Sequence, residues 1–149
     1  MDLHSSRKAA DTCLGAAIRR AAREVTAHYD RTLAPAGLKS TQFTVLNAIH
    51  LMTVPTVSRL SEALVMDRTT LTRNLDVVIR NGWVARGVGR EDRRERIVRL
   101  TAKGRRVLAN ALPYWRRAQA AVVDRLGETS VGQLRSALDR LEQVEPREP

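Results

Sequence analysis

A group of arginine, threonine and asparagine side chains lies close together near the middle of the chain. It comprises Arg68, Thr69, Thr70, Thr72, Arg73 and Asn74. An arginine guanidinium can donate two hydrogen bonds to guanine O6 and N7, and a threonine can contact a base edge or the methyl group of thymine. These residue types suit a helix that reads base edges in DNA, although the same composition also fits an ordinary solvated helix face.

A second group of arginines occupies residues 87–95, a polar segment that contains glycine. It comprises Arg90, Arg93 and Arg94, with Asp92 among them. Residues 83–86 and 96–100 on either side alternate around β-branched residues, which predicts the two short strands of a hairpin. The charged tip of such a hairpin can lie along phosphates or enter a narrow minor groove, where the negative potential attracts arginine.

The elements that must position these two groups are mostly helical. Apolar residues at spacings of three and four predict helices over residues 9–33, 41–51, 57–64, 68–81, 102–126 and 131–144. The residues expected to N-cap the last five helices are Ser40, Thr56, Asp67, Thr101 and Ser130, and Ser130 with Gln133 forms a capping box. We therefore expect a mainly α protein with a small β-hairpin, that is, an α+β arrangement.

Charge is concentrated where these two groups lie. The 149 residues include 26 Lys and Arg against 16 Asp and Glu, for a net charge of +10. Residues 56–106 alone hold 13 basic and 6 acidic side chains. Because 43% of the residues are hydrophobic, the chain is not expected to be disordered. A basic surface of this kind favours nucleic acid, although anionic membranes and acidic proteins also fit.

Several classes of protein are not expected from the sequence. The chain has no apolar run long enough to cross a membrane and no signal peptide at its start, so we expect a cytoplasmic protein. His4, His28, His50 and the single cysteine, Cys13, do not have the spacing of metal ligands, and we expect no metal or cofactor. Neither a glycine-rich phosphate loop nor a nucleophile elbow is present, so we do not expect an enzyme.

The succession of helix, short helix, polar helix and charged hairpin is that of a winged helix-turn-helix. Residues 60–64 (LSEAL), 66–73 (MDRTTLTR) and 81–86 (NGWVAR) are followed by 91–94 (EDRR), 97–101 (IVRLT) and the pair Lys103-Gly104. On these segments the chain resembles the MarR family of bacterial transcription regulators over nearly its whole length. The hairpin segment matches the family pattern D-x-R followed by V-x-L-T-x-x-G.

The resemblance implies a homodimer that binds double-stranded DNA at a pseudo-palindromic operator, most simply as a repressor. Residues 36–106 would form the winged helix-turn-helix, and residues 1–35 and 107–149 the helical dimerisation region. Arg94 would enter the minor groove, Asp92 would brace the wing, and Arg90 and Arg93 would contact phosphates. Apolar stripes on the first and last helices support a two-fold interface. Its expected residues are Leu14, Ile18, Leu134, Leu138 and Leu141.

The resemblance also implies a small phenolic or aromatic carboxylate effector, bound in a cleft between the two regions. The residues expected to line it are His28, Tyr29, Phe43, Asn47, Tyr114 and Trp115. Two alternatives remain open. A branch of the family senses peroxide through a cysteine in the first helix, so Cys13 could act as a redox sensor or be an ordinary packing residue. A nonspecific architectural DNA-binding protein would show the same basic charge.

Overall fold

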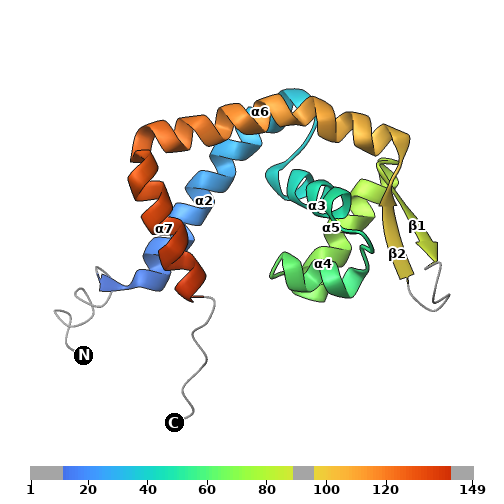
Figure 1. Cartoon of the computed structure of the whole chain (residues 1–149), viewed down its shortest axis with the longest axis horizontal. Coiled ribbons are helices and arrows are strands. Elements are labelled where there is room, and N and C mark those ends of the chain that lie inside the picture. Colours follow the sequence, from blue (N-terminus) through green and yellow to red (C-terminus); the bar gives the residue numbers. More distant parts are fainter. Residues whose placement is uncertain (1–11, 89–95, 142–149) are drawn as a thin grey trace, which may run out of the picture.

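A computed structural model of the chain describes residues 12–88 and 96–141. Two lobes lie at opposite ends of the molecule (Figure 1). The elements, in chain order, are α2 (Leu14–Leu33), the short 3-10 helix η1 (Ala34–Ala36), α3 (Ser40–Leu51), α4 (Val57–Ala63), α5 (Arg68–Arg80), β1 (Val84–Val88), β2 (Arg96–Leu100), α6 (Ala102–Leu126) and α7 (Glu128–Leu141). The mainly helical composition with one hairpin confirms the predicted fold class. No helix among the described residues is long and apolar enough to span a membrane.

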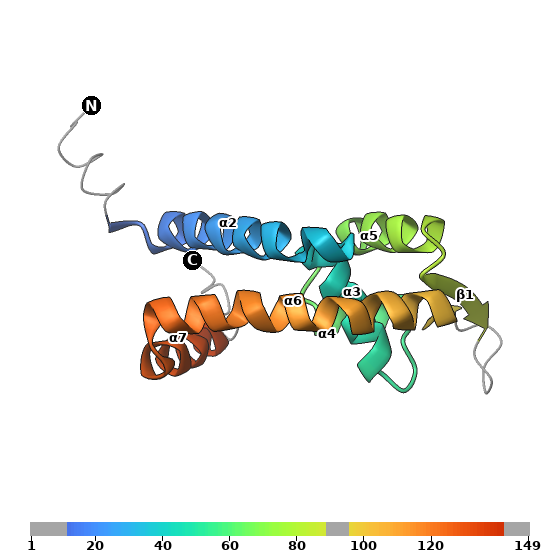
Figure 2. The same ribbon diagram turned by 90° about the horizontal axis from the view of Figure 1, so that it is seen from above.

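Helix α6 extends through both lobes. Figure 2 shows α6 running the length of the molecule, from the hairpin at one end to α7 at the other. The first lobe contains α2, α7 and the second half of α6, and the second lobe contains α3, α4, α5 and the hairpin. The expected boundary at residue 107 lies inside α6, so the two regions share a continuous backbone there.

The hydrophobic core lies in the second lobe and extends to the junction with α2 and α6. Leu46, Leu60 and Leu71 are completely buried, and Leu33 of α2 and Ala111 of α6 are buried with them. Each of these residues lies on the apolar side of a different helix, so the core holds α5 against α3 and α4. The polar residues 68–74 of α5 are therefore attached to a packed core.

Three of the predicted N-caps are confirmed. The Thr56 hydroxyl accepts the backbone N–H of Arg59, the Asp67 carboxylate accepts that of Thr70, and the Thr101 hydroxyl accepts that of Gly104. Each bond satisfies one of the N–H groups that the first turn of a helix leaves without a partner. These caps fix where α4, α5 and α6 begin.

Two predicted caps are wrong. Ser40 is the first residue of α3 and not its N-cap, because the Asp30 carboxylate of α2 accepts both its backbone N–H and its hydroxyl, each at 2.7 Å. The capping box of Ser130 and Gln133 does not start the last helix, since α7 begins at Glu128 directly after Gly127. Gly127 has a φ of +81° and ends α6 by itself, so no separate loop precedes α7.

The hairpin is a two-stranded antiparallel sheet. Its first strand begins at Val84, one residue later than predicted. Its register pairs Val84 with Leu100 and Val88 with Arg96. Val98 also donates its backbone N–H to the carbonyl of Pro55, at 2.9 Å. The base of the hairpin is thereby attached to the segment before α4. The first helix, predicted to run unbroken over residues 9–33, begins instead at Leu14, because the backbone of Cys13 is extended. Residues 9–11 and 142–144, the predicted ends of the first and last helices, lie outside the described residues.

Candidate nucleic-acid interface

The polar group of residues 68–74 lies on α5, with its side chains away from the core. Leu71, Leu75 and Val78 are buried on one side of this helix. Thr69 and Arg73 are exposed on the opposite side, and neither side chain has a hydrogen bond within the described part of the chain. Both are therefore free to turn toward a ligand that approaches α5.

Three other side chains of the predicted group are bonded to their own helix. Thr70 donates its hydroxyl to the Asp67 carboxylate at 2.6 Å, Thr72 donates to the carbonyl of Arg68 at 2.7 Å, and Asn74 donates to the carbonyl of Thr70 at 2.9 Å. A threonine bonded in this way still presents its methyl group and its oxygen lone pairs. Thr72 can therefore contact a thymine methyl or accept a hydrogen bond, and Thr70 first of all completes the cap.

The Asp67 carboxylate is the anchor of the N-terminal end of α5. Its hydrogen bonds lower its pKa, with the Thr70 hydroxyl as the largest cause and the Thr70 backbone N–H next. A negative charge at a helix N-terminus also interacts favourably with the helix dipole. Asp67 thus stays ionised and holds the first turn of α5 in place.

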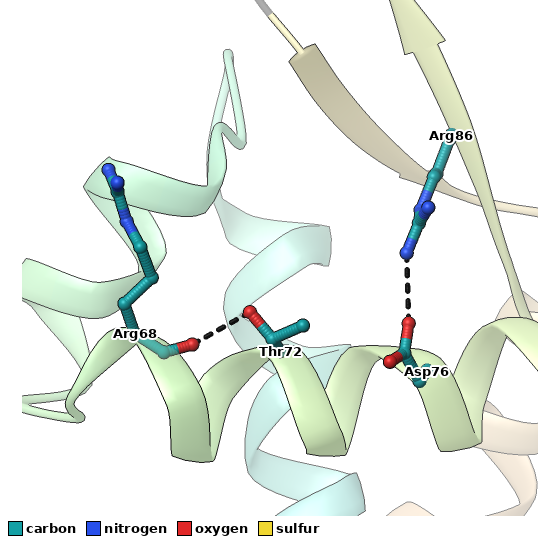
Figure 3. Close-up of polar contacts among 4 residues, drawn as sticks. All are labelled: Arg68, Thr72, Asp76 and Arg86. Carbon is teal, nitrogen blue, oxygen red and sulfur yellow. Dashed lines mark hydrogen bonds and ion pairs between the residues drawn. The ribbon is translucent and has the colours of Figure 1, made fainter.

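An ion pair joins α5 to the hairpin, and the sequence pattern does not identify Arg86 as the partner of Asp76. Figure 3 shows Arg68, Thr72 and Asp76 along one side of α5, with Arg86 reaching from β1 to Asp76. The Arg86 Nη2 atom lies 2.9 Å from the Asp76 carboxylate. Arg68 in turn lies 3.3 Å from the Ser58 hydroxyl of α4. Side chains on this side of α5 therefore contact both neighbouring elements.

A groove of about 470 Å³ separates α5 from the hairpin. Its lining combines apolar side chains with one hydroxyl and one guanidinium, and comprises Val57, Thr72, Leu75, Arg86, Gly87, Val88, Ile97 and Val98. The predicted wing residues Arg90, Asp92, Arg93 and Arg94 lie outside the described residues. Strand β1, which precedes these residues in the chain, packs against α5.

The expected effector residues gather where α2, α3 and α6 meet, but they contact one another and their neighbours. Phe43 is 5% exposed and stacks on Trp115, with ring centroids 6.0 Å apart and an interplanar angle of 12°. Tyr29 donates its hydroxyl to the Gln119 side chain, and burial raises the pKa of this hydroxyl. His28 lies 3.1 Å from the Ala118 carbonyl. Tyr114 packs against the core, and Asn47 is half-buried on α3; both are also expected effector residues.

The residues expected at the dimer interface are exposed or half-buried in the single chain. Leu14 of α2 is 61% exposed, and Leu134, Leu138 and Leu141 of α7 are between 39% and 49% exposed. Ile18 is half-buried beside Leu14. Exposed leucines on two helices of one lobe are unusual for a monomer and are typical of an interaction surface. Cys13 precedes α2 and is free and exposed.

Comparisons with known proteins agree with this geometry. The family model of the MarR family matches residues 36–95. The HTH-type transcriptional regulator YwoH of Bacillus subtilis (strain 168) is 34% identical over 84 residues, which are 56% of this chain and 61% of YwoH. The match thus spans about three fifths of that relative's length.

Two solved structures cover most of the chain. The M. tuberculosis transcriptional regulator MosR in complex with DNA is 42% identical, with a TM-score of 0.79, over 88% of this chain and 94% of MosR. The transcriptional repressor CouR bound to p-coumaroyl-CoA is 25% identical, with a TM-score of 0.82, over 92% of this chain and 96% of CouR. Together with the exposed polar face of α5 beside a hairpin, these matches show that the chain belongs to the MarR family of transcriptional regulators.

Proposed function

We propose that this chain forms a homodimeric repressor that binds a pseudo-palindromic operator in double-stranded DNA. The α5 helix of each protomer would enter the major groove of one half-site. The observation that supports this most directly is the position of Thr69 and Arg73, which are exposed and unbonded on a helix fixed by the Asp67 cap and a buried leucine face. The similarity to MosR, which has been solved in complex with DNA, also favours DNA binding by this chain.

The residues assigned to DNA contact follow from this arrangement. Arg73 and Thr69 would contact base edges, and Arg68 and Thr72 would lie at the side of the helix that faces the hairpin. Thr70 and Asn74 support the helix and are secondary candidates. By resemblance, Arg94 would enter the minor groove with Asp92 bracing it, while Arg90 and Arg93 would contact phosphates, which position the protein without reading sequence. Residues 36–106 would thus form the DNA-binding region.

The dimer would form through residues 1–35 and 107–149, with Leu14, Ile18, Leu134, Leu138 and Leu141 in its interface. Burying leucines that are now in water is favourable by about 25 cal/mol per Å² of apolar surface. Leu138→Asp places a charge in this interface and should abolish the dimer in light scattering. Arg135→Asp, on the same helix but outside the leucine set, is the matched control. A folded, fully dimeric Leu138→Asp protein would show that the interface lies elsewhere.

An aromatic carboxylate or phenolic effector would release the repressor from DNA. CouR, bound to p-coumaroyl-CoA, is a family member with an aromatic acyl ligand. In this chain Phe43 and Trp115, two of the residues expected to line the effector cleft, stack on each other, so an effector that inserts between them would have to separate the two rings. Such an effector would act by preferring a conformation in which the two α5 helices no longer match successive major grooves.

The experiment that tests the function is selection of DNA by the purified protein at physiological salt, from a random pool and from sheared genomic DNA of its source. Recovery of a two-fold symmetric sequence supports the proposal. Equal retention of all sequences, lost as salt rises, would support the architectural alternative. Retention that depends on oxidation of Cys13, and is unaffected by oxidant in Cys13→Ser, would support the redox alternative. We assign the chain no catalytic role and place it in the cytoplasm with its DNA.

A further inference from the structure

We propose that Arg86 contacts the DNA sugar–phosphate backbone and that Asp76 is the positioning residue that holds the Arg86 guanidinium for this contact. The inference rests on the proposed DNA binding and adds two residues to it. Neither residue belongs to the polar group of residues 68–74 or to the hairpin tip.

The location of the ion pair is the first argument. Asp76 follows Arg68 and Thr72 at intervals of four residues, so the three side chains lie on one side of α5 on successive turns. This side faces β1, and Arg86 reaches across from that strand (Figure 3). The pair therefore lies at the edge of the groove between α5 and the hairpin, which Thr72 and Arg86 both line.

The path of DNA past this groove is the second argument. Adjacent major and minor grooves of a duplex are separated by one sugar–phosphate strand. With α5 in the major groove and the hairpin directed at the neighbouring minor groove, that strand must cross the surface between α5 and β1. The groove of about 470 Å³ lies there. The Arg86 guanidinium is therefore within the path of the phosphates.

The exposure of the pair is the third argument. The side chains of Arg86 and Asp76 are 69% and 51% exposed. An ion pair as exposed as this contributes little to folding, because water and salt screen it. The pair therefore has little value as a purely structural contact. We infer that its main effect is to orient the Arg86 guanidinium.

The chemistry of the guanidinium completes the argument. Arginine has five N–H donors in a planar fork, and the Asp76 contact is made by Nη2 alone. The remaining donors are available to a phosphate oxygen. A carboxylate on the DNA side of the protein would by itself repel phosphates. Here it fixes the orientation of Arg86 before binding, so less side-chain freedom is lost when the phosphate arrives.

The two effects of Asp76 have opposite signs, which makes them separable. If Asp76 only repels DNA, Asp76→Asn strengthens binding whether or not Arg86 is present. If Asp76 positions Arg86, Asp76→Asn weakens binding and does so only when Arg86 is present. A double-mutant cycle of Asp76→Asn and Arg86→Gln measures this dependence directly.

The probes are a duplex selected by the wild-type protein from a random pool and a scrambled duplex of the same length. Dissociation constants are measured by fluorescence anisotropy over a series of salt concentrations. We expect Arg86→Gln to weaken binding to both duplexes by a similar factor and to reduce the slope of log K against log salt by about one. Asp76→Asn should weaken binding several-fold in the wild-type background, and should not weaken it beside Arg86→Gln, where only the repulsion between the carboxylate and the phosphates is lost.

Two further variants make the result specific. Glu62→Gln removes an exposed acid from α4 in the same lobe and should leave the salt slope unchanged. Arg86→Lys keeps the charge without the planar fork, and should keep the salt slope while losing the dependence on Asp76. Circular dichroism confirms that each variant is folded.

An unchanged salt slope in Arg86→Gln would overturn the phosphate contact. Stronger binding by Asp76→Asn in both backgrounds would overturn the positioning role. Failure of the wild type to select any sequence would instead count against the operator proposal. The effect of Arg86 on the salt slope could still be measured with the scrambled duplex.

Discussion

Among the glycines that the structure describes, Gly104 is the one at which an added methyl group should do the most damage to the second lobe, which contains α5. It lies in the first turn of α6, against the chain that enters β1. A Cβ atom at this position would lie 1.9 Å from the carbonyl oxygen of Trp83 and 2.8 Å from its carbonyl carbon. That carbonyl is itself held, because it accepts the backbone N–H of Thr101 at 3.0 Å. Gly104→Ala therefore forces backbone against backbone.

The expected cost follows from what must move. The methyl carbon and the Trp83 oxygen have to separate by about 1 Å, which overpacks the site at a cost of roughly 1–3 kcal/mol. Moving the carbonyl also weakens its hydrogen bond from Thr101, at about 1 kcal/mol. We expect Gly104→Ala to lower the free energy of unfolding by about 2–4 kcal/mol, a large part of the 5–15 kcal/mol typical of a domain.

Urea unfolding followed by circular dichroism measures this loss. Gly132→Ala is the matched control, because Gly132 lies in α7 with no atom within 4 Å of the added Cβ. A glycine replaced by alanine in an open helix position should stabilise the protein by about 0.5–1 kcal/mol. A Gly104→Ala protein within about 0.5 kcal/mol of the wild type would refute the close approach of α6 to Trp83 on which the reasoning depends.

Substitutions at three other positions test local features. Val65 has a left-handed φ of +48° after α4, so Val65→Gly should raise the free energy of unfolding by about 1 kcal/mol in urea unfolding, and Val65→Ala by much less. Asp67→Ala should destabilise α5 and lower the free energy of unfolding. Because hydrogen bonds lower the Asp67 pKa in the folded protein, the wild type should keep its whole advantage in unfolding free energy above about pH 4, the ordinary carboxyl pKa. This advantage should disappear as the pH falls through the lowered pKa of the folded state. Asp30→Ala removes both bonds to Ser40 and should cost about 1–2 kcal/mol in thermal unfolding, whereas an unchanged melting temperature would show that the cap is dispensable.

The success of the sequence predictions depended on the range of the interaction concerned. Thr56, Asp67 and Thr101 cap their helices through bonds to residues three positions later, so the pattern of residue types along the chain contains the whole interaction. The N-terminus of α3 is capped by Asp30, ten residues earlier and on another helix. No local rule connects Asp30 with Ser40, because the contact exists only after α2 and α3 pack together.

The candidate site follows the same division. The polar face of α5 was predictable because burial of Leu71 and Leu75 determines which residues remain exposed. The contact of Arg86 with Asp76 was not, since it depends on the strand register and on how the hairpin packs against α5. The sequence also gives no indication that Phe43 and Trp115, both expected to line an effector cleft, stack on each other.

The two lobes are joined by more than the α6 backbone. Consecutive residues of α2 contact different elements: His28 lies against the Ala118 carbonyl of α6, Tyr29 donates to Gln119 of α6, and Asp30 accepts two bonds from Ser40 of α3. Hydrogen bonds weaken steeply with distance and angle, so α2 cannot shift relative to both neighbours without breaking some of them. In the proposed dimer, a change in how α2 packs at the two-fold interface would therefore move α3 and the α5 helix that packs on it. An effector that changes the contacts at this junction could therefore change the distance between the two α5 helices of the dimer.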